Sequence, residues 1–212
     1  MSVKLTEIFY SIQGESATIG HPTVFVRLTG CPMRCTYCDT AYAFHGGERL
    51  ELDEILDQVA QFDARYVTVT GGEPLAQPDC WPLLNKLCDV GYKVSLETGG
   101  AISIADIDPR VYIVLDVKTP ASGEEANNRY DNLDLIQDKD CLKFVICDRE
   151  DYEWSRNFVT ERNLDGLCEV FFSPSADQLN AKDLAEWILE DRLNVRFQVQ
   201  LHKVLWDDAQ GK

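Results

Sequence analysis

The sequence is short of basic residues and contains no long apolar run. It has 20 Lys and Arg residues against 36 Asp and Glu residues, a formal net charge of -16 at pH 7. Such a field repels nucleic-acid phosphates and anionic lipid, and no local basic patch offsets it. No segment approaches the roughly 20 apolar residues of a membrane-spanning helix. We therefore expect neither nucleic acid nor a membrane among the partners.

The first residues also lack the features of a secretory signal. The N-terminus MSVKLTEIFYSIQGES has no uninterrupted apolar stretch and no small-residue cleavage site. Internal repeats, low-complexity tracts and interdomain linkers are absent as well. A chain of 212 residues that is 45% hydrophobic can bury one sizeable core. These features predict a soluble cytoplasmic protein with a single domain over residues 1–212.

Cysteine, by contrast, is plentiful and falls into two groups. Three cysteines lie close together, and five are scattered through the chain. The close group is Cys31, Cys35 and Cys38, and the scattered group is Cys80, Cys88, Cys141, Cys147 and Cys168. Without a secretory signal, so many thiols favour metal binding over a disulfide framework. The scattered five are predicted to be small core residues, because free cysteine is among the most buried residue types.

Short β-branched runs alternate with segments of helical spacing along the chain. Strands are predicted at 23–29, 66–70, 93–97, 112–117, 142–146, 169–173 and 195–201. Helices are predicted at 51–62, 80–90, 150–163 and 177–193, whereas the links 98–111 and 119–140 carry no convincing helix. This alternation is typical of an α/β protein with a mainly parallel sheet. A complete eight-fold barrel needs about 250 residues, so we expect an abridged, partly open (βα) barrel.

Residue parity along these strands places polar side chains on one face of the sheet. The residues that share this face are Thr68, Thr70, Ser95, Glu97, Tyr112, Asp116, Gln198, Gln200 and His202. An antiparallel sheet with one wet face would give the same pattern. Helices between the strands should cover the apolar face, which leaves the polar face to line a lumen suited to a small polar ligand.

The three close cysteines form a C-x3-C-x2-C loop directly after the predicted strand at 23–29. Three thiolates at this spacing suit a soft metal centre, either zinc or an iron-sulfur cluster. Zinc would need a fourth ligand, which His45 could supply. A 4Fe-4S cluster held by three cysteines keeps one iron open for a substrate or cofactor. No Ser/His/Asp set or paired-carboxylate catalytic set is evident.

This loop, with Tyr37 before its third cysteine, and the tetrapeptide Gly71-Gly72-Glu73-Pro74 resemble the radical S-adenosylmethionine (SAM) superfamily. The flanking segments at 9–16, 20–40, 67–74, 96–100 and 115–124 are similar to the 7-carboxy-7-deazaguanine synthase family, with weaker similarity at 173–175 and 200–203. The resemblance implies reductive cleavage of SAM at a 4Fe-4S cluster. The resulting 5'-deoxyadenosyl radical would convert 6-carboxy-5,6,7,8-tetrahydropterin to 7-carboxy-7-deazaguanine, with Mg2+ assisting the ring contraction and loss of ammonia. Queuosine and other 7-deazapurines are made by this pathway.

The resemblance also implies roles for individual residues. The cluster ligands would be Cys31, Cys35 and Cys38, and the Mg2+ ligand would be Thr40. The SAM contacts would be Tyr37, Asp39, Gly72, Asp116, Val117 and Lys118, with Glu97 a weaker candidate for SAM or substrate. The substrate contacts would be Ile12, Gln13, Gly14, Arg27 and Thr70. It further implies a homodimer and an electron donor such as flavodoxin.

Several of these residues have a plain structural alternative. Arg27 lies mid-strand in an apolar run, where an unpaired guanidinium is costly to bury, so either a substrate carboxylate or an acidic residue of the chain would pair with it. Asp116 and Lys118 could form an ordinary ion pair, Gly72 could be a turn glycine, and Thr40 could cap a helix. The segment after Trp206 has no clear role in the resemblance.

Two rival functions are left open by the sequence. A non-enzymatic zinc module would use the three cysteines and His45 but leaves the Gly-Gly-Glu-Pro segment unexplained. A glycyl-radical activase would share the radical chemistry but would need a large docking surface for a partner enzyme.

Anaerobic reconstitution with iron and sulfide separates the cluster from the zinc module. We expect a brown, oxygen-sensitive protein with about four irons per chain, measured by metal analysis and absorption spectroscopy. A colourless protein that retains a single zinc ion would contradict the cluster assignment.

Overall fold

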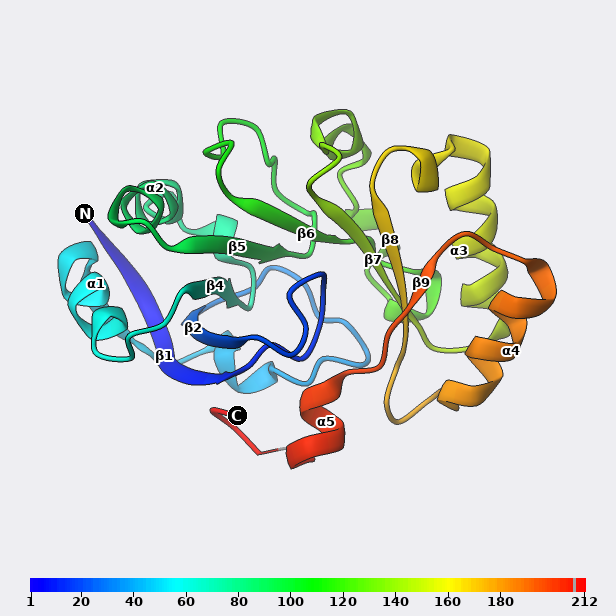
Figure 1. The fold of residues 1–212 in the computed structure, drawn as a ribbon, viewed down its shortest axis with the longest axis horizontal. Coiled ribbons are helices and arrows are strands. Elements are labelled where there is room, and N and C mark those ends of the chain that lie inside the picture. Colours follow the sequence, from blue (N-terminus) through cyan, green and yellow to red (C-terminus); the bar gives the residue numbers. More distant parts are fainter. Residues whose placement is uncertain (208) are drawn as a thin grey trace.

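The computed structural model describes residues 1–207 and 209–212, and its central feature is one curved nine-stranded sheet (Figure 1). The strands are β1 (Ser2–Ile12), β2 (Pro22–Leu28), β3 (Glu48–Glu51), β4 (Tyr66–Gly71), β5 (Lys93–Thr98), β6 (Tyr112–Asp116), β7 (Cys141–Ile146), β8 (Glu169–Pro174) and β9 (Arg196–Phe197). Their order in the sheet is β3-β1-β2-β4-β5-β6-β7-β8-β9. Neighbours from β2 to β9 are parallel, whereas β1 is antiparallel to both β2 and β3. The sheet does not close, which confirms the predicted α/β class and partly open barrel.

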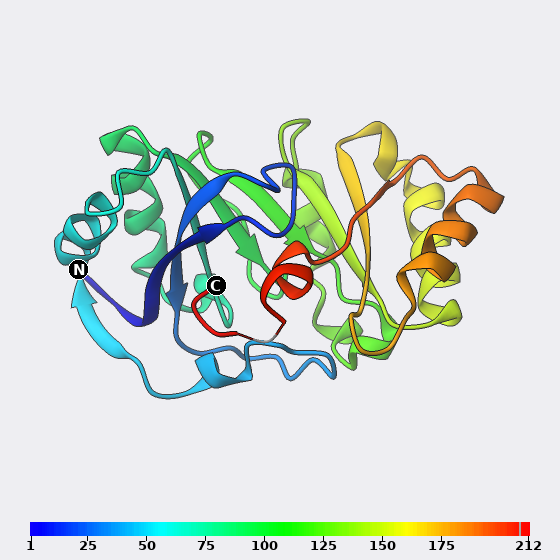
Figure 2. The same ribbon diagram turned by 60° about the horizontal axis from the view of Figure 1, so that its bottom comes forward.

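Four helices cover the outer side of this sheet (Figures 1 and 2). They are α1 (Leu52–Ala60), α2 (Cys80–Val90), α3 (Arg149–Arg162) and α4 (Ala181–Asp191). The 3-10 helices are η1 (Ala41–Phe44), η2 (Pro74–Ala76), η3 (Pro120–Ser122), η4 (Glu125–Asn127), η5 (Tyr130–Leu135) and η6 (Leu164–Gly166). The links at 98–111 and 119–140 contain no α-helix, as expected. None of the described helices is long and apolar enough to cross a membrane.

Local sequence signals explain where the helices begin and end. Glu51 and Glu54 form a capping box at the start of α1, and the Asp148 side chain accepts the backbone N–H of Asp151 at the start of α3. The α2 helix ends at Gly91, whose φ of 103° is a left-handed conformation that glycine adopts without steric cost. These signals agree with the predicted helix positions, and α2 has the predicted bounds.

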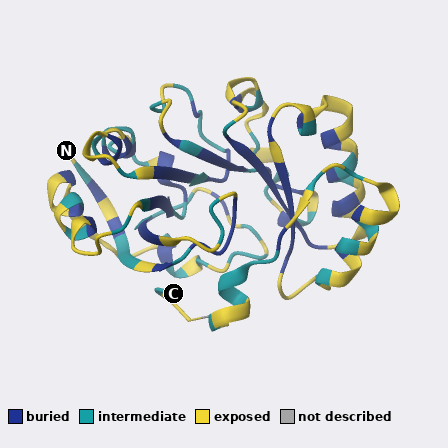
Figure 3. Ribbon diagram, in the orientation of Figure 1, coloured by how far each residue is buried: buried dark blue, intermediate teal, exposed yellow. Residues whose placement is uncertain are grey.

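One hydrophobic core lies between the helices and the apolar face of the sheet (Figure 3). Val67, Val69, Val94 and Leu96 on β4 and β5 belong to this core together with the buried leucines of α2. The polar residues of the same strands face the opposite side of the sheet, as residue parity predicts. All five scattered cysteines are buried, which confirms them as core residues.

The chain after α4 differs from the prediction of a strand at 195–201. Only Arg196 and Phe197 pair with β8, and Leu201 begins a short helix, α5 (Leu201–Trp206), on the concave side of the sheet. The Gln198 N–H still donates to the Phe172 carbonyl of β8 at 3.0 Å, but the segment then turns to other partners. The Gln198 side-chain oxygen accepts the Ser16 N–H at 2.7 Å, and the Leu201 N–H donates to the Gly14 carbonyl at 3.1 Å. These tertiary bonds override the β-propensity of the segment. The structure also contains two antiparallel strands, β1 and β3, that the prediction omits.

Candidate active site

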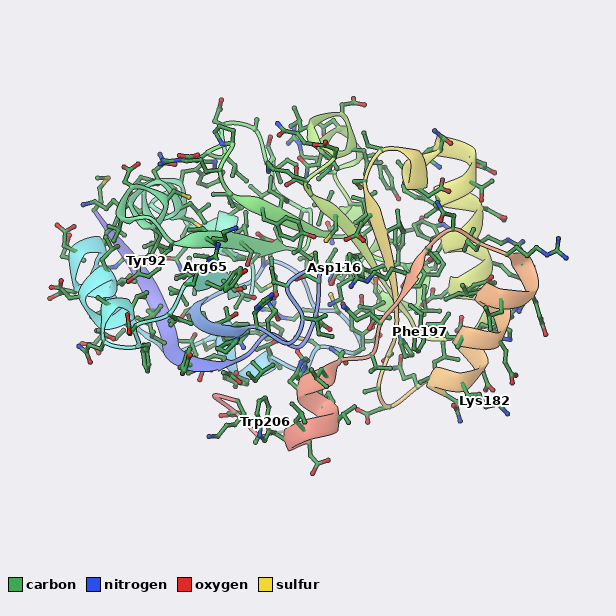
Figure 4. The ribbon with its side chains drawn as sticks, viewed as in Figure 1. Arg65, Tyr92, Asp116, Lys182, Phe197 and Trp206 are labelled. Atoms are coloured by element: carbon green, nitrogen blue, oxygen red, sulfur yellow. The ribbon has the colours of Figure 1, made fainter. Side chains whose placement is uncertain are left out.

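A cavity of about 710 Å³ lies on the polar face of the sheet, at the carboxyl ends of the parallel strands. Ligand sites in parallel α/β folds occur at this end of the strands. Every residue assigned a role by the resemblance lines the cavity except Val117. Asp116 lies near the centre of the molecule, and Trp206 lies on α5 (Figure 4). The structure thus brings together residues from the whole length of the chain.

The three cysteines of the loop after β2 are half-buried and line one side of this cavity. Burial raises the pKa of Cys31, and it raises the pKa of Cys35 to about 11, so both thiols hold their protons until a metal displaces them. His45 is exposed and does not line the cavity, which weighs against a closed Cys3His zinc site. In the part of the chain that the structure describes, no group of three or more His, Cys, Asp and Glu side chains is arranged as a ready-made metal site.

Gly72 lies in van der Waals contact with the first part of the cysteine loop. A Cβ atom added at Gly72 would lie 2.3 Å from the Gly30 carbonyl oxygen and 2.7 Å from Cys31 Cβ, which is closer than real Cβ atoms approach. The next residue, Glu73, donates its backbone N–H to the same Gly30 carbonyl at 2.8 Å. A glycine is therefore required here for packing between the ends of β2 and β4, whatever it contacts in the cavity.

Glu73 joins the end of β4 to the end of β5. Its fully buried carboxylate accepts hydrogen bonds from Thr98 Oγ1 at 2.8 Å, from the Gly99 N–H at 2.8 Å and from the Leu75 N–H at 3.1 Å. Burial raises the pKa of Glu73, and these donors oppose the shift. The Gly-Gly-Glu-Pro segment thus carries a structural carboxylate beside the glycine that faces the cysteines.

A second cluster of polar groups lies at the end of β6. Lys118 Nζ pairs with Asp116 Oδ2 at 3.0 Å and lies 5.6 Å from the centre of the Tyr37 ring. Burial alone would lower the pKa of Lys118, but Asp116, Tyr37 and Cys35 raise it well above its ordinary value, so the ammonium stays charged. Asp116 Oδ1 and the Tyr37 hydroxyl are buried and have no hydrogen-bond partner among the described residues. Such orphaned atoms fit a site that receives a polar cofactor.

Val117 is the one predicted contact that lies apart from the cavity. Its side chain is 4% exposed and belongs to the hydrophobic core, because strand alternation directs it away from Asp116 and Lys118. Its backbone N–H donates to the Lys143 carbonyl at 2.8 Å.

A largely buried hydrogen-bond network also lines the cavity. Gln13 Nε2 donates to Thr68 Oγ1 at 3.2 Å and to Glu97 Oε1 at 3.1 Å, and Thr70 Oγ1 donates to Glu97 Oε2 at 3.1 Å. Burial and the nearby Glu15 carboxylate raise the pKa of Glu97. Glu97 therefore bonds directly to two of the predicted substrate contacts, Gln13 and Thr70.

Two further charged residues of the cavity were missed by the sequence reasoning. Lys143, on β7, forms a buried ion pair with Glu15, and Glu15 Oε1 is buried without a hydrogen-bond partner among the described residues. Burial alone would lower the pKa of Lys143, but Glu15 and Asp116 raise it. The signal was present, because Lys143 interrupts the apolar run LKFVI in the way that Arg27 interrupts TVFVRLT.

Arg27 pairs with an acidic residue of the chain, which is one of the two partners that the sequence analysis considered for it. Its Nε donates to Glu7 Oε1 at 2.8 Å, and the same oxygen accepts the Tyr42 hydroxyl at 2.7 Å. The guanidinium carbon also lies 5.6 Å from the centre of the Phe9 ring. Arg27 still lines the cavity, with 15% of its side chain exposed, so the pairing orients it without removing it from the site.

Asp39, Thr40 and His202 meet at the border between the cysteine loop and α5. Thr40 Oγ1 donates to Asp39 Oδ1 at 2.7 Å, and His202 Nε2 stands 3.9 Å from Asp39 Oδ2. The α5 helix packs tightly on the end of β1, since a Cβ atom at Gly14 would lie 2.4 Å from His202 Nδ1. Residues after Trp206, among them Asp207 and Gly211, also line the cavity, as do Ser175 and Gln200.

The chain is similar to known proteins over most of its length. Residues 25–120 match the radical SAM superfamily. Proteins named 7-carboxy-7-deazaguanine synthase from Chlorobaculum tepidum and Koribacter versatilis are 45% and 41% identical; the alignments cover 99% and 96% of this chain and 97% of each relative.

Solved structures show the same fold. The crystal structure of QueE from Escherichia coli superposes with a TM-score of 0.78 at 23% identity, covering 95% of each chain. Streptococcus suis SuiB bound to the precursor peptide SuiA gives a TM-score of 0.59 at 15% identity over 84% of this chain and 48% of that chain.

Replacing Gly72 with alanine tests the packing of the cysteine loop. The new Cβ would collide with the Gly30 carbonyl and Cys31, so we expect a loss of about 1–3 kcal/mol in the free energy of unfolding and poor retention of iron after reconstitution. Chemical denaturation and iron analysis measure the two effects. Wild-type iron content and stability in Gly72→Ala would show that the loop does not depend on this contact.

Proposed function

Because the chain belongs to the 7-carboxy-7-deazaguanine synthase family of radical SAM enzymes, we propose that its cavity converts 6-carboxy-5,6,7,8-tetrahydropterin to 7-carboxy-7-deazaguanine and ammonia. The observation that carries this proposal is the convergence, around one cavity, of the three-cysteine loop, the Asp116–Lys118 pair and the Gln13–Glu97 network. Each of the three fits a different ligand of the reaction.

The cysteine loop and the end of β6 would hold the cofactors. We assign Cys31, Cys35 and Cys38 to a 4Fe-4S cluster, which when bound supplies the electron for reductive cleavage of SAM. Asp116 and Lys118 offer a carboxylate and an ammonium to the amino and carboxylate groups of SAM. Tyr37, Asp39 and Gly72 complete this side of the cavity, and the contribution of Val117 is limited to its backbone.

The network around Glu97 would bind the ring of the substrate. A pterin ring presents adjacent N–H donors, which match the acceptor oxygens of Glu97 and the unsatisfied Oε1 of Glu15. Thr70 and Gln13 donate hydrogen bonds to Glu97 and so orient it. The positive charge of Lys143 offsets part of the repulsion between the Glu97 and Glu15 carboxylates. Ile12 and Gly14 lie at the same border of the cavity.

Arg27 would bind the carboxylate of the substrate, with Thr40 as the Mg2+ ligand beside it. Arg27 is oriented by Glu7 and Tyr42, and a guanidinium binds a carboxylate through two parallel hydrogen bonds. The Thr40 hydroxyl, which donates to Asp39 Oδ1 at 2.7 Å, would offer its oxygen to Mg2+, a cation that prefers oxygen ligands. The family relationship further supports a cytoplasmic homodimer, reduced by a donor such as flavodoxin and built as a single domain over residues 1–212.

Mass spectrometry of a single reaction tests the proposal. We expect the reconstituted protein to form 7-carboxy-7-deazaguanine from SAM, a reductant, Mg2+ and 6-carboxytetrahydropterin, with a lower rate when Mg2+ is chelated. Formation of 5'-deoxyadenosine without this product would support radical SAM chemistry but contradict the proposed substrate. Product formation at an unchanged rate without Mg2+ would contradict the proposed role of Mg2+.

Replacing Arg27 tests its assignment to the substrate. In Arg27→Gln the paired hydrogen bonds to the substrate carboxylate are lost, so we expect substrate affinity to fall about 10- to 100-fold. Iron content and SAM affinity should equal those of the wild type, because Arg27 bonds to Glu7 and packs on Phe9 and Tyr42, none of which is assigned to iron or SAM. Loss of the cluster in this variant would assign Arg27 a structural role instead.

A further inference from the structure

Asp151, on α3 and outside the cavity, has a buried carboxylate with an unusual number of partners. It is 1% exposed and accepts three hydrogen bonds: from Thr119 Oγ1 at 2.9 Å, from the Ala121 N–H at 2.9 Å and from the Cys147 N–H at 3.1 Å. Two of these donors belong to the segment that follows β6, and the third follows β7. The carboxylate therefore fixes both strand exits to the first turn of α3.

Asp151 binds residues 119 and 121, and the cysteine loop binds the same stretch of chain at residues 121–124. Thr36, between Cys35 and Cys38, donates its N–H to the Ser122 carbonyl at 3.0 Å and its hydroxyl to the Ala121 carbonyl at 2.8 Å. The Arg34 N–H donates to Glu124 Oε1 at 2.6 Å. The cysteine loop is thus anchored to residues 121–124, directly after the segment that Asp151 binds.

The same segment begins where the SAM-facing pair ends, because Thr119 follows Lys118 in the chain. A single buried carboxylate consequently sets the place of the cysteine loop and of the β6 exit relative to each other. We propose that Asp151 is a positioning residue that fixes the Cys35–Cys38 half of the cysteine loop against Asp116 and Lys118, and so the placement of the residues that would hold the cluster relative to those that would bind SAM.

The chemistry of the contacts requires a carboxylate rather than an amide. Each carboxylate oxygen accepts a backbone N–H, Oδ1 that of Ala121 and Oδ2 that of Cys147. In either orientation, the NH2 group of an asparagine would face one of these N–H donors. The position in the first turn of α3 also favours a negative charge, because the unpaired N–H groups of a helix N-terminus carry partial positive charge. Asp151→Asn therefore leaves the size of the side chain nearly unchanged but removes at least one of its hydrogen bonds.

Asp140 provides a matched control at the other end of the sheet. It is 2% exposed and accepts the backbone N–H groups of Ile113 at 2.9 Å and Gln137 at 3.0 Å, next to the amino end of β7. Unlike Asp151, it also pairs with a lysine, Lys139, at 2.7 Å. Asp140→Asn should disturb the fold in a similar way but far from the cysteines. Any general loss of stability is common to both variants.

Hydrogen exchange of the iron-free protein gives the first readout. We expect the Thr36 amide to exchange about tenfold faster in Asp151→Asn than in the wild type and at the wild-type rate in Asp140→Asn. Should Asp151→Asn not fold, Thr119→Val removes one of the three bonds and is expected to give a smaller change in the same direction. Unchanged exchange at Thr36, or equal acceleration in both asparagine variants, would overturn the proposal.

The second readout is the binding of SAM to the reconstituted protein. We expect Asp151→Asn to retain about four irons but to bind SAM about tenfold more weakly, with a smaller SAM-induced change in the electron paramagnetic resonance spectrum of the reduced cluster. Wild-type SAM affinity in this variant would overturn the proposal. The inference rests on the proposed cluster ligands: failure of the wild type to bind iron would reject those ligands, whereas the exchange experiment judges Asp151 independently.

Discussion

The contact between the ends of β2 and β4 is the constraint on which the rest of the site depends. Gly72 lies against Gly30 and Cys31, and Glu73 bonds both to the Gly30 carbonyl and to Thr98 and Gly99 at the end of β5. Three neighbouring strand ends are thereby joined around the cysteine loop. Because the loop is bound to residues 121–124 on its other side, its path is determined from two directions, and the cavity lies between them.

The charge of the cavity is balanced locally even though the whole chain is strongly acidic. Three cations line the cavity, Arg27, Lys118 and Lys143, and each pairs with a carboxylate, namely Glu7, Asp116 and Glu15. Buried ion pairs of this kind contribute little net stability, since desolvation of both charges opposes their attraction. Their value here is that partly anionic ligands meet fixed cations in a protein whose net charge of -16 would otherwise repel them.

Sequence patterns were sufficient for the parts of the structure that rest on local signals. Strand parity placed Thr70, Glu97 and Asp116 on the cavity face, and helical periodicity located the four outer helices. Tertiary contacts decided the parts that were wrong or missing. The segment at 195–201 leaves the sheet because Gln198 and Leu201 bond to Ser16 and Gly14, far away in the chain. The sequence marks Lys143 only as a charge within an apolar run. Its partner Glu15, and the Asp151 partners Thr119 and Ala121, lie far away in the chain, so no local pattern reveals what these side chains bind.

The two edges of the open sheet have a consequence for the behaviour of the protein in concentrated solution. An unclosed barrel exposes backbone N–H and C=O groups that can pair with another chain and lead to aggregation. Here the edge strands are short: β3 has four residues, three of them charged, and β9 has two, one of which is Arg196. Little backbone is therefore available for pairing, and the barrel stays open to small molecules without presenting a template for fibrils.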